Sequence, residues 1–289
     1  MTQTDHNPTC TLIVSCPDSV GIVAAVANFV AERTGSLLES NHHTDIEQGW
    51  FFMRNVITSE SLAISLEEFR AQFEPLAEQF GMQWSLRDNT KLQKVVLLAS
   101  HASHCVADLL YRWKAGEMAF DIPCVISNHE NLRGMVEWHG IPFHYVPVPK
   151  ENKDAAFAQV NEIVARHNAD CVVLARYMQI IPPELCDIYA GRLINIHHSF
   201  LPSFIGANPY QKAYDRGVKL IGATSHYVTQ DLDEGPIIEQ DVIRVNHSCD
   251  RDEMVRLGRD VEKAVLARAL RYHLEDRVIV RGNKTVVFL

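Results

Sequence analysis

The chain has 289 residues and a formal charge of -9 at pH 7, from 27 basic and 36 acidic side chains. It contains no block of consecutive basic residues, which disfavours binding to nucleic acid or to an anionic membrane. Seven cysteines at scattered spacings, without a CxxC pair, indicate neither a disulfide framework nor a zinc ribbon. Without a signal-like segment or an apolar run of about 18 residues, the sequence predicts a cytoplasmic protein that does not enter the membrane.

The N-terminal part of the chain predicts a small domain that alternates strands and helices. Strands are predicted at 11–16, 36–45, 50–58 and 82–86, and helices at 20–33 and 66–80. This βαββαβ order is the ferredoxin-like α+β arrangement. The polar segment 87–93 then separates two regions of different periodicity, so we place two domains at residues 1–90 and 91–289.

The turn after the first predicted strand reads Pro17-Asp18-x-x-Gly21-Ile22 and resembles the ACT regulatory domains. The resemblance implies that Asp18, Gly21 and Ile22 bind an amino-acid effector, with glycine and methionine as opposing effectors. It also implies a homo-oligomer formed by pairing of these domains. The residues themselves allow a purely structural alternative, in which Asp18 caps the next helix and Gly21 permits close backbone approach.

Residues 91–289 predict a doubly wound, mostly parallel, Rossmann-like α/β domain, because strand and helix patterns alternate along the chain. The predicted strands are 94–99, 123–127, 142–146, 170–175, 192–196, 220–227 and 237–245. The predicted helices are 105–115, 133–139, 154–167, 183–189 and one that Asp250 and Glu253 begin as a capping box, followed by a terminal hairpin at Gly282-Asn283. In this fold, ligands bind outside the carboxyl ends of the parallel strands.

Polar side chains collect at those strand ends. Asn195 and His197 are two residues apart at the end of one predicted strand, so their side chains project to the same side and His198 is expected to point away. Asp233 follows another strand in a loop that can reach them. An amide, an imidazole and a carboxylate together can polarise a carbonyl and move a proton, although all three residue types also serve turns and caps.

Several other chemistries have little support. The chain has no GxGxxG turn, no GxxxxGK[ST] loop and no GxSxG elbow, which disfavours nucleotide cofactors and serine hydrolysis. A metal site built from His197, His198, His226 and Asp233 is disfavoured because the two adjacent histidines diverge and no HExxH spacing fixes a ligand pair. We therefore predict no metal and no cofactor.

The motif Asn195-x-His197, the run from 198 to 210, and His226 with Asp233 seven residues later resemble the formyltetrahydrofolate-dependent formyltransferase fold. The longer runs resemble the formyltetrahydrofolate deformylases. The resemblance implies that Asn195, His197 and Asp233 are the catalytic set, acting on 10-formyltetrahydrofolate. It also implies a substrate site formed by Met178, Gln179, Ile180, Ile181, His226 and Gly235, in which His226 either contacts substrate or only positions Asp233.

Two activities of this fold, hydrolysis and formyl transfer, differ in the nucleophile that attacks the formyl carbon. The related phosphoribosylglycinamide formyltransferases anchor the acceptor's phosphate on a glycine-rich loop after the first strand, but here residues 100–105 contain no glycine. We therefore expect water to attack, giving tetrahydrofolate and formate and so balancing the one-carbon pool for purine synthesis. The transferase is the alternative, since His101 or His104 can still contact an anion, and a catalytically silent folate sensor is a further one.

Overall fold

The computed structural model describes residues 8–203 and 208–289, which divide into two compact units. The first unit extends to Leu92 and also contains Asp276–Ile279 and Val286–Leu289. The second contains Gln93–Glu275 and Val280–Thr285. The predicted boundary at residue 90 lies close to this division in the linker but assigned the C-terminal segments wholly to the second domain.

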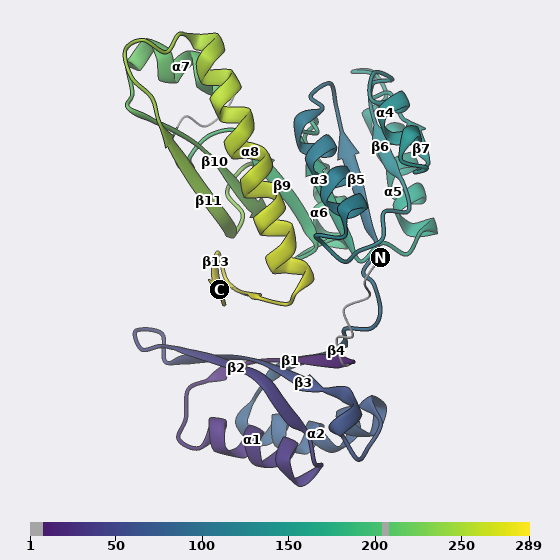
Figure 1. The fold of residues 1–289 in the computed structure, drawn as a ribbon, viewed down its shortest axis with the longest axis vertical. Coiled ribbons are helices and arrows are strands. Elements are labelled where there is room, and N and C mark those ends of the chain that lie inside the picture. The colour runs from purple at the N-terminus through teal and green to yellow at the C-terminus, as the bar shows by residue number, and fades with distance from the viewer. Residues whose placement is uncertain (1–7, 204–207) are drawn as a thin grey trace. The chain divides into compact units, whose positions relative to one another are not determined.

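The first unit is a four-stranded antiparallel sheet with two helices on one face (Figure 1). Its strands are β1 (Thr9–Pro17), β2 (Ser36–Asp45), β3 (Trp50–Thr58) and β4 (Gln83–Asp88), in the order β2-β3-β1-β4. Its helices are α1 (Ile22–Glu32), α2 (Leu66–Phe80) and the short 3-10 helix η1 (Ser59–Ser61). Phe69 and Phe73, on the predicted apolar face of α2, are fully buried against the sheet. The ferredoxin-like order predicted from the sequence is present.

The two helices of the first unit begin differently. Ser65 and Glu68 form a reciprocal capping box at the start of α2. Helix α1 instead follows Gly21, whose φ of 95° requires glycine, and it has no side-chain cap. The expectation that Asp18 caps this helix was wrong, because Asp18 lies too far before the first turn and its backbone N–H donates to the Gly49 carbonyl instead.

The C-terminal hairpin supplies apolar side chains to the other face of the same sheet. It consists of β12 (Val278–Arg281) and β13 (Lys284–Val287). Ile279 and Phe288 pack with the buried Phe52 of β3. The hairpin itself was predicted, but its period-2 pattern could not show which sheet it would cover.

The second unit is built on a seven-stranded sheet in the order β11-β10-β9-β8-β5-β6-β7. Its strands are β5 (Val95–Ala99), β6 (Val125–Ser127), β7 (Phe143–Tyr145), β8 (Cys171–Ala175), β9 (Leu193–His197), β10 (Leu220–Tyr227) and β11 (Ile237–Arg244). The strands from β9 to β7 are parallel, and β10 and β11 are antiparallel additions at one edge. This is the doubly wound, mostly parallel fold predicted from the sequence.

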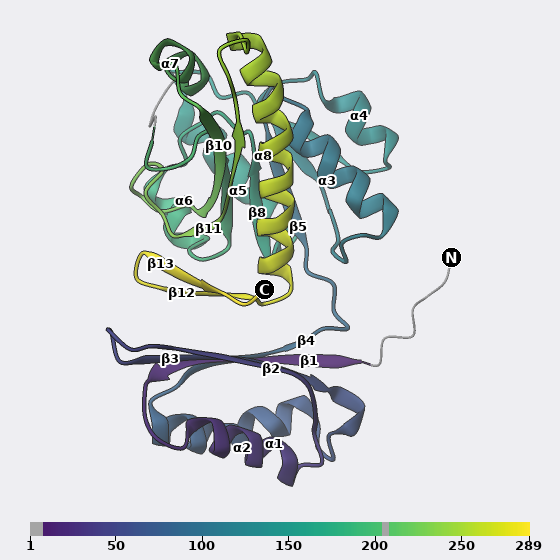
Figure 2. The ribbon, with the colours of Figure 1, turned by 60° about the vertical axis from the view of Figure 1, so that its left-hand side comes forward.

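Helices cover both faces of this sheet (Figure 2). They are α3 (His104–Ala115), α4 (Arg133–Trp138), α5 (Lys153–Arg166), α6 (Pro183–Ile188), α7 (Pro209–Arg216) and α8 (Arg251–Leu274). Helices α5 and α6 pack on one face, and α8 contacts α3 and strands β9 to β11 on the other. Helix α7 was not predicted, because it is only 8 residues long and too short to show a clear apolar periodicity.

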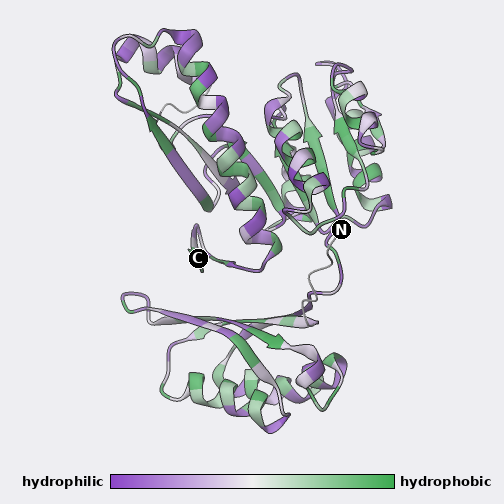
Figure 3. Ribbon diagram, viewed as in Figure 1, coloured by the Kyte–Doolittle hydropathy of each residue, from purple (hydrophilic) through white to green (hydrophobic). Residues whose placement is uncertain are grey.

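The hydropathy of the elements follows their burial. Strands β5 and β6 are hydrophobic in Figure 3, as expected for parallel strands covered on both faces, whereas α8 is mixed. Asp250 accepts a hydrogen bond from the Glu253 N–H and caps α8, as predicted. Among the helices described, none is both long and apolar enough to span a bilayer.

The strand order reverses between β5 and β8, which is where ligands bind in doubly wound sheets. From β5 the chain runs outward to β6 and β7, then returns to β8 and β9 on the other side. The parallel register pairs Ala99 with Ala175, so the next residues, Ser100 and Arg176, leave the sheet side by side.

The buried centre of this sheet gives a stability prediction. Replacing Leu97, which is fully buried on β5, with alanine should lower the free energy of unfolding by about 2–5 kcal/mol, because it removes apolar contacts and leaves a cavity. Leu92→Ala is the control, since Leu92 is 56% exposed and loses little. Urea denaturation of both variants measures the difference, and equal losses would contradict the burial argument.

Candidate active site

A cavity of about 470 Å³ lies at the carboxyl ends of β8 and β9. The predicted catalytic residues Asn195, His197 and Asp233 all line it. The predicted substrate residues His226 and Met178, Gln179, Ile180 and Ile181 line it as well. The fold thus collects side chains from four separate segments around one space.

Strand pairing explains why three of these side chains meet. Asn195 and His197 end β9, and the antiparallel neighbour β10 places His226 opposite Asn195. Asp233 reaches them from the loop between β10 and β11, where its backbone adopts a left-handed φ of 58°. Aspartate tolerates this conformation better than most side chains do.

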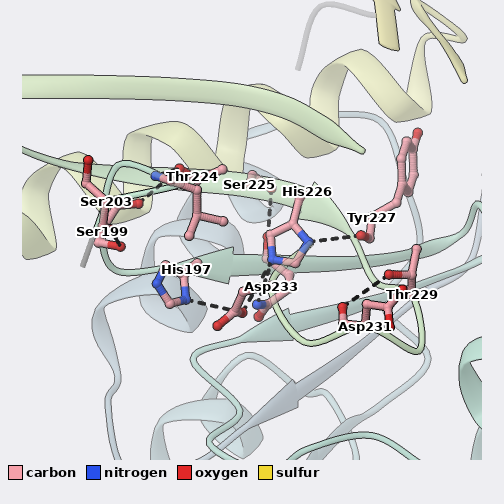
Figure 4. A network of polar contacts seen from close by, with 12 residues as sticks. His197, Ser199, Ser203, Thr224, Ser225, His226, Tyr227, Thr229, Asp231 and Asp233 are labelled. Atoms are coloured by element: carbon pink, nitrogen blue, oxygen red, sulfur yellow. Dashed lines mark hydrogen bonds and ion pairs between the residues drawn. The ribbon is translucent and has the colours of Figure 1, made fainter. Parts of the chain in front are cut away.

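Asp233 contacts both imidazoles (Figure 4). Its Oδ1 lies 3.2 Å from Nδ1 of His197 and 3.8 Å from Nε2 of His226. Nδ1 of His226 donates to the Tyr227 carbonyl at 2.9 Å, because a carbonyl can only accept. In the neutral imidazole, Nε2 of His226 then accepts from the Asn195 amide at 3.2 Å, whereas in the imidazolium the same nitrogen donates toward Asp233. One carboxylate oxygen therefore ties the three sequence motifs together.

The carboxyl of Asp233 is held ionised. Burial alone would raise its pKa, but the hydrogen bonds and positive charges of His197 and His226 together keep that pKa well below the ordinary value of 3.8. Asp233 is consequently an acceptor and a negative charge in this cavity at neutral pH.

His197 has one ring nitrogen without a partner. Nδ1 faces Asp233, whereas the buried Nε2 makes no hydrogen bond to any residue of the described chain. A buried polar atom left unpaired costs free energy, and such atoms are rare in folded proteins. Nε2 is thus positioned to bond to a ligand in the cavity.

The expectation that His198 points away from the site was wrong. His198 lines the same cavity, and its ring centroid lies 5.3 Å from that of His197. Strand β9 ends at His197, so strict alternation no longer applies to the next residue. Burial, assisted by the charge of Arg176, lowers the pKa of His198 to about 3, so this imidazole is neutral.

The segment after β8 forms an apolar wall. Met178 is 58% exposed and Ile180 is 68% exposed, and Leu232 lines the same cavity. The Met178 N–H donates to Ser100 Oγ at 2.9 Å, and Ser100 in turn donates to Asn128 at 2.6 Å. The wall is therefore fixed from β5, and this N–H of Met178 is not available to a heterocycle.

Gly235 allows the loop that carries Asp233 to pack closely against β10. A side chain at this position would overlap the backbone carbonyl of Tyr227, so only glycine allows the loop to lie against β10. Gly235 does not line the cavity. Substrate contact by Gly235 stays a prediction, whereas its packing role follows directly from the structure.

The site's donors do not coincide with metal-binding groups. Among described residues, two groups of side chains are close enough to share a metal ion: Cys124 with His144 and His167, and His104 with Cys105 and Glu262. Neither contains a predicted catalytic residue. The absence of a metal and of a cofactor stays a prediction.

The predicted effector residues lie in the first unit. Ile22 is 2% exposed and its side chain belongs to the core, so a surface ligand would meet only its backbone. Asp18 and Gly21 lie in the exposed turn before α1. Effector binding by these three residues stays a prediction.

The model of a family described as "Formyl transferase" matches residues 93–270. A formyltetrahydrofolate deformylase from Bacillus subtilis is 49% identical over 278 residues, which cover 96% of this chain and 93% of that protein. The chain belongs to the formyltetrahydrofolate deformylase family. The crystal structure of a formyltetrahydrofolate deformylase from Pseudomonas syringae is similar to it with a TM-score of 0.97 and 58% identity, over 99% of this chain and 96% of that one.

The transferases are more distant from this deformylase family member. The structure of a glycinamide ribonucleotide transformylase from Symbiobacterium toebii has a TM-score of 0.64 and 26% identity. The similar part covers 94% of the transformylase chain but only 68% of this chain. The deformylase relatives match over nearly the whole length, which favours the first of the two activities considered from the sequence.

The sequence did not single out Arg176, Asn208 and Leu232, which also line the cavity. Arg176 directly follows β8 at the reversal point of the sheet, and that position alone could have marked it. Asn208 follows residues 204–207, which belong to the motif run at 198–210 but lie outside the described residues. No local pattern marks Leu232, because its exposure depends on the course of the loop.

Packing at Gly235 gives a kinetic prediction. Gly235→Ala should lower kcat by at least about tenfold, because the loop must move away from Tyr227 and Asp233 moves with it. Gly134→Ala is the matched control, since a side chain there meets open space. Steady-state kinetics of both folded variants measures this, and unchanged turnover in Gly235→Ala would contradict the positioning role.

The lowered pKa of Asp233 gives a stability prediction. The ionised form of Asp233 stabilises the fold fully at pH values above its unfolded-state pKa of 3.8. This stabilisation is lost as the pH falls from there through the lower pKa of the folded state. Between about pH 5 and about pH 3, the wild-type chain should therefore lose stability relative to Asp233→Asn. Thermal unfolding of both at the two pH values tests this, and a difference in midpoint that does not change with pH would refute it.

Proposed function

We propose that the chain hydrolyses 10-formyltetrahydrofolate to tetrahydrofolate and formate. The observation that carries this proposal is the unpaired, buried Nε2 of His197, whose other nitrogen is held by ionised Asp233. Asn195 lines the same cavity as His197, so the two residues can supply two donors to one carbonyl oxygen. Membership of the deformylase family supplies the substrate class.

In the proposed reaction, Asn195 and protonated His197 stabilise the oxyanion. The Asn195 amide has two N–H groups, of which one faces His226, so the other is free to donate to the formyl oxygen. In its protonated form His197 donates from Nε2, while its Nδ1 lies 3.2 Å from the Asp233 carboxylate. Donors placed where negative charge develops lower the barrier by about 2.7–4 kcal/mol each.

Asp233 also acts on the attacking water. It orients the water or accepts its proton while the water oxygen forms a bond to the formyl carbon. The bond between that carbon and N10 of the folate then breaks, N10 takes a proton, and formate leaves. His226 keeps Asp233 in place, since its Nδ1 is fixed by the Tyr227 carbonyl.

The apolar wall suits the flat heterocycle of a folate. Met178, Ile180 and Leu232 are exposed large apolar side chains on one cavity, an arrangement typical of ligand sites. Gln179 and Ile181 flank them. We propose that the pterin packs on this wall and that the formyl-bearing N10 of the folate lies toward His197.

We further propose a role and a regulation that rest on resemblance to the ACT domains. The enzyme would work in the cytoplasm, supply formate and balance the one-carbon pool for purine synthesis. Glycine or methionine would bind the first unit near Asp18 and Gly21. The long edge strand β2 of its sheet supports pairing with a second copy, because an edge strand has unpaired backbone groups.

The test of the proposed function is Asp233→Asn. Formate release from 10-formyltetrahydrofolate, with water as the only acceptor, should fall by at least about a hundredfold, because the charge that supports His197 is lost. Binding of tetrahydrofolate, followed by calorimetry, should persist. Asp231→Asn is the matched control, since this exposed aspartate lies two residues away in the same loop.

Normal formate release by Asp233→Asn would refute the assignment of Asp233. Absence of formate release by the wild-type chain would favour the folate sensor instead. Turnover that appears only after glycinamide ribonucleotide is added would favour the transferase.

A further inference from the structure

The carboxylate of Glu262, on α8, is buried beside the active site without a role in the proposed reaction. Glu262 is 1% exposed, and three side chains from three other segments contact it. Tyr210 donates to it at 2.6 Å, His104 Nε2 lies 2.7 Å away, and Arg176 Nε lies 3.3 Å away. Burial alone would raise the pKa of Glu262, but these partners hold it below its ordinary value, so the group is an anion.

Arg176 stands between two cavities. It lines the main cavity with His197 and Asp233, and it also lines a second cavity of about 190 Å³. His198 and Asn208 line both spaces as well. The Arg176 side chain is 15% exposed and its backbone has a left-handed φ of 63°, a conformation that ordinarily favours glycine. The ion pair to Glu262 thus holds a long side chain at the reversal point of the sheet.

The rest of the cluster is built to keep this ion pair in place. Tyr210 reaches Glu262 across Gly258, one helical turn earlier on α8. A side chain at Gly258 would overlap the Tyr210 ring, so this helix carries glycine where the tyrosine must pass. His104 comes from the glycine-free segment after β5 and bonds that segment to Glu262.

The size of the second cavity limits what can approach the formyl carbon. Arg176 and His198 line both cavities, so the second cavity is a space that adjoins the main cavity, where the folate is proposed to bind. Sites for small organic ligands measure about 300–1,000 Å³, whereas one water takes up about 30 Å³. The second cavity, at about 190 Å³, is smaller than a typical site for a small organic ligand but large enough for water.

We propose that Arg176, anchored by Glu262, is a specificity-determining residue that closes the acceptor side of the site, so that water is the only nucleophile. This inference rests on the proposed hydrolysis of 10-formyltetrahydrofolate. With Arg176 removed, the two cavities join and an amine nitrogen can attack the formyl carbon in place of water. The amine then forms the new bond to that carbon, N10 again takes a proton, and the product is a formylated amine.

The experiment measures the ratio of formylated amine to formate with glycinamide as the added amine. In Arg176→Gly this ratio should rise by at least about tenfold over the wild-type chain, because a steric barrier to the competing nucleophile is removed. Arg176→Lys, which keeps a long cation beside Glu262, should stay close to wild type. Arg259→Ala, which removes another guanidinium that lines the second cavity, should also release formate alone.

A second variant keeps the test valid if Arg176→Gly does not fold. Arg176→Gly leaves a buried carboxylate with fewer partners, which destabilises proteins, so Arg176→Gly/Glu262→Gln removes both charges together. Circular dichroism establishes which variants are folded. If Arg176→Gly or Arg176→Gly/Glu262→Gln is folded and forms no more formylated glycinamide than wild type, the inference is overturned. Failure of the wild-type chain to release formate would refute the proposed function itself, and the inference with it.

Discussion

The contact of Asp233 with His197 is the interaction on which the rest of the site depends. A carboxylate removed from water needs compensating partners, and here two imidazoles supply them from β9 and β10. The contact fixes one nitrogen of His197 and leaves the other unpaired in the cavity. Gly235 and the left-handed backbone of Asp233 serve the same end, because they let the loop after β10 approach the strand closely.

The reversal of strand order explains where this contact lies. Strands β5 and β8 leave the sheet side by side, so Ser100 and Arg176 emerge at one point although 76 positions separate them. Ser100 supports the apolar wall, and Arg176 divides the main cavity from its neighbour. A second buried carboxylate, Glu262, holds Arg176 there. The contact of Asp233 with His197 and that of Arg176 with Glu262 thus lie at two adjoining cavities.

Much of the fold and of the site could be predicted from local pattern. The apolar runs of β5 and β8 and the amphipathic face of α2 were correct because burial imposes a period that a single segment shows. Asn195, His197 and Asp233 were placed together by the strand-end rule and by resemblance, and they do line one cavity. The predictions for Asp18 and His198 were wrong because both residues lie outside regular elements. Helix α1 begins after Gly21, so Asp18 is not at its capping position, and β9 ends at His197, so the alternation of side chains does not apply to His198.

The sequence by itself determined the ferredoxin-like pattern and the doubly wound pattern, the grouping of Asn195, His197 and Asp233, and the absence of glycine at 100–105. These are local properties, carried by composition and spacing within short segments. Only the tertiary structure decided that the C-terminal hairpin covers the first sheet, that His198 lines the site, and that Arg176 meets Glu262. Those contacts join segments far apart in the chain, and their geometry depends on strand order and register, which no single segment records.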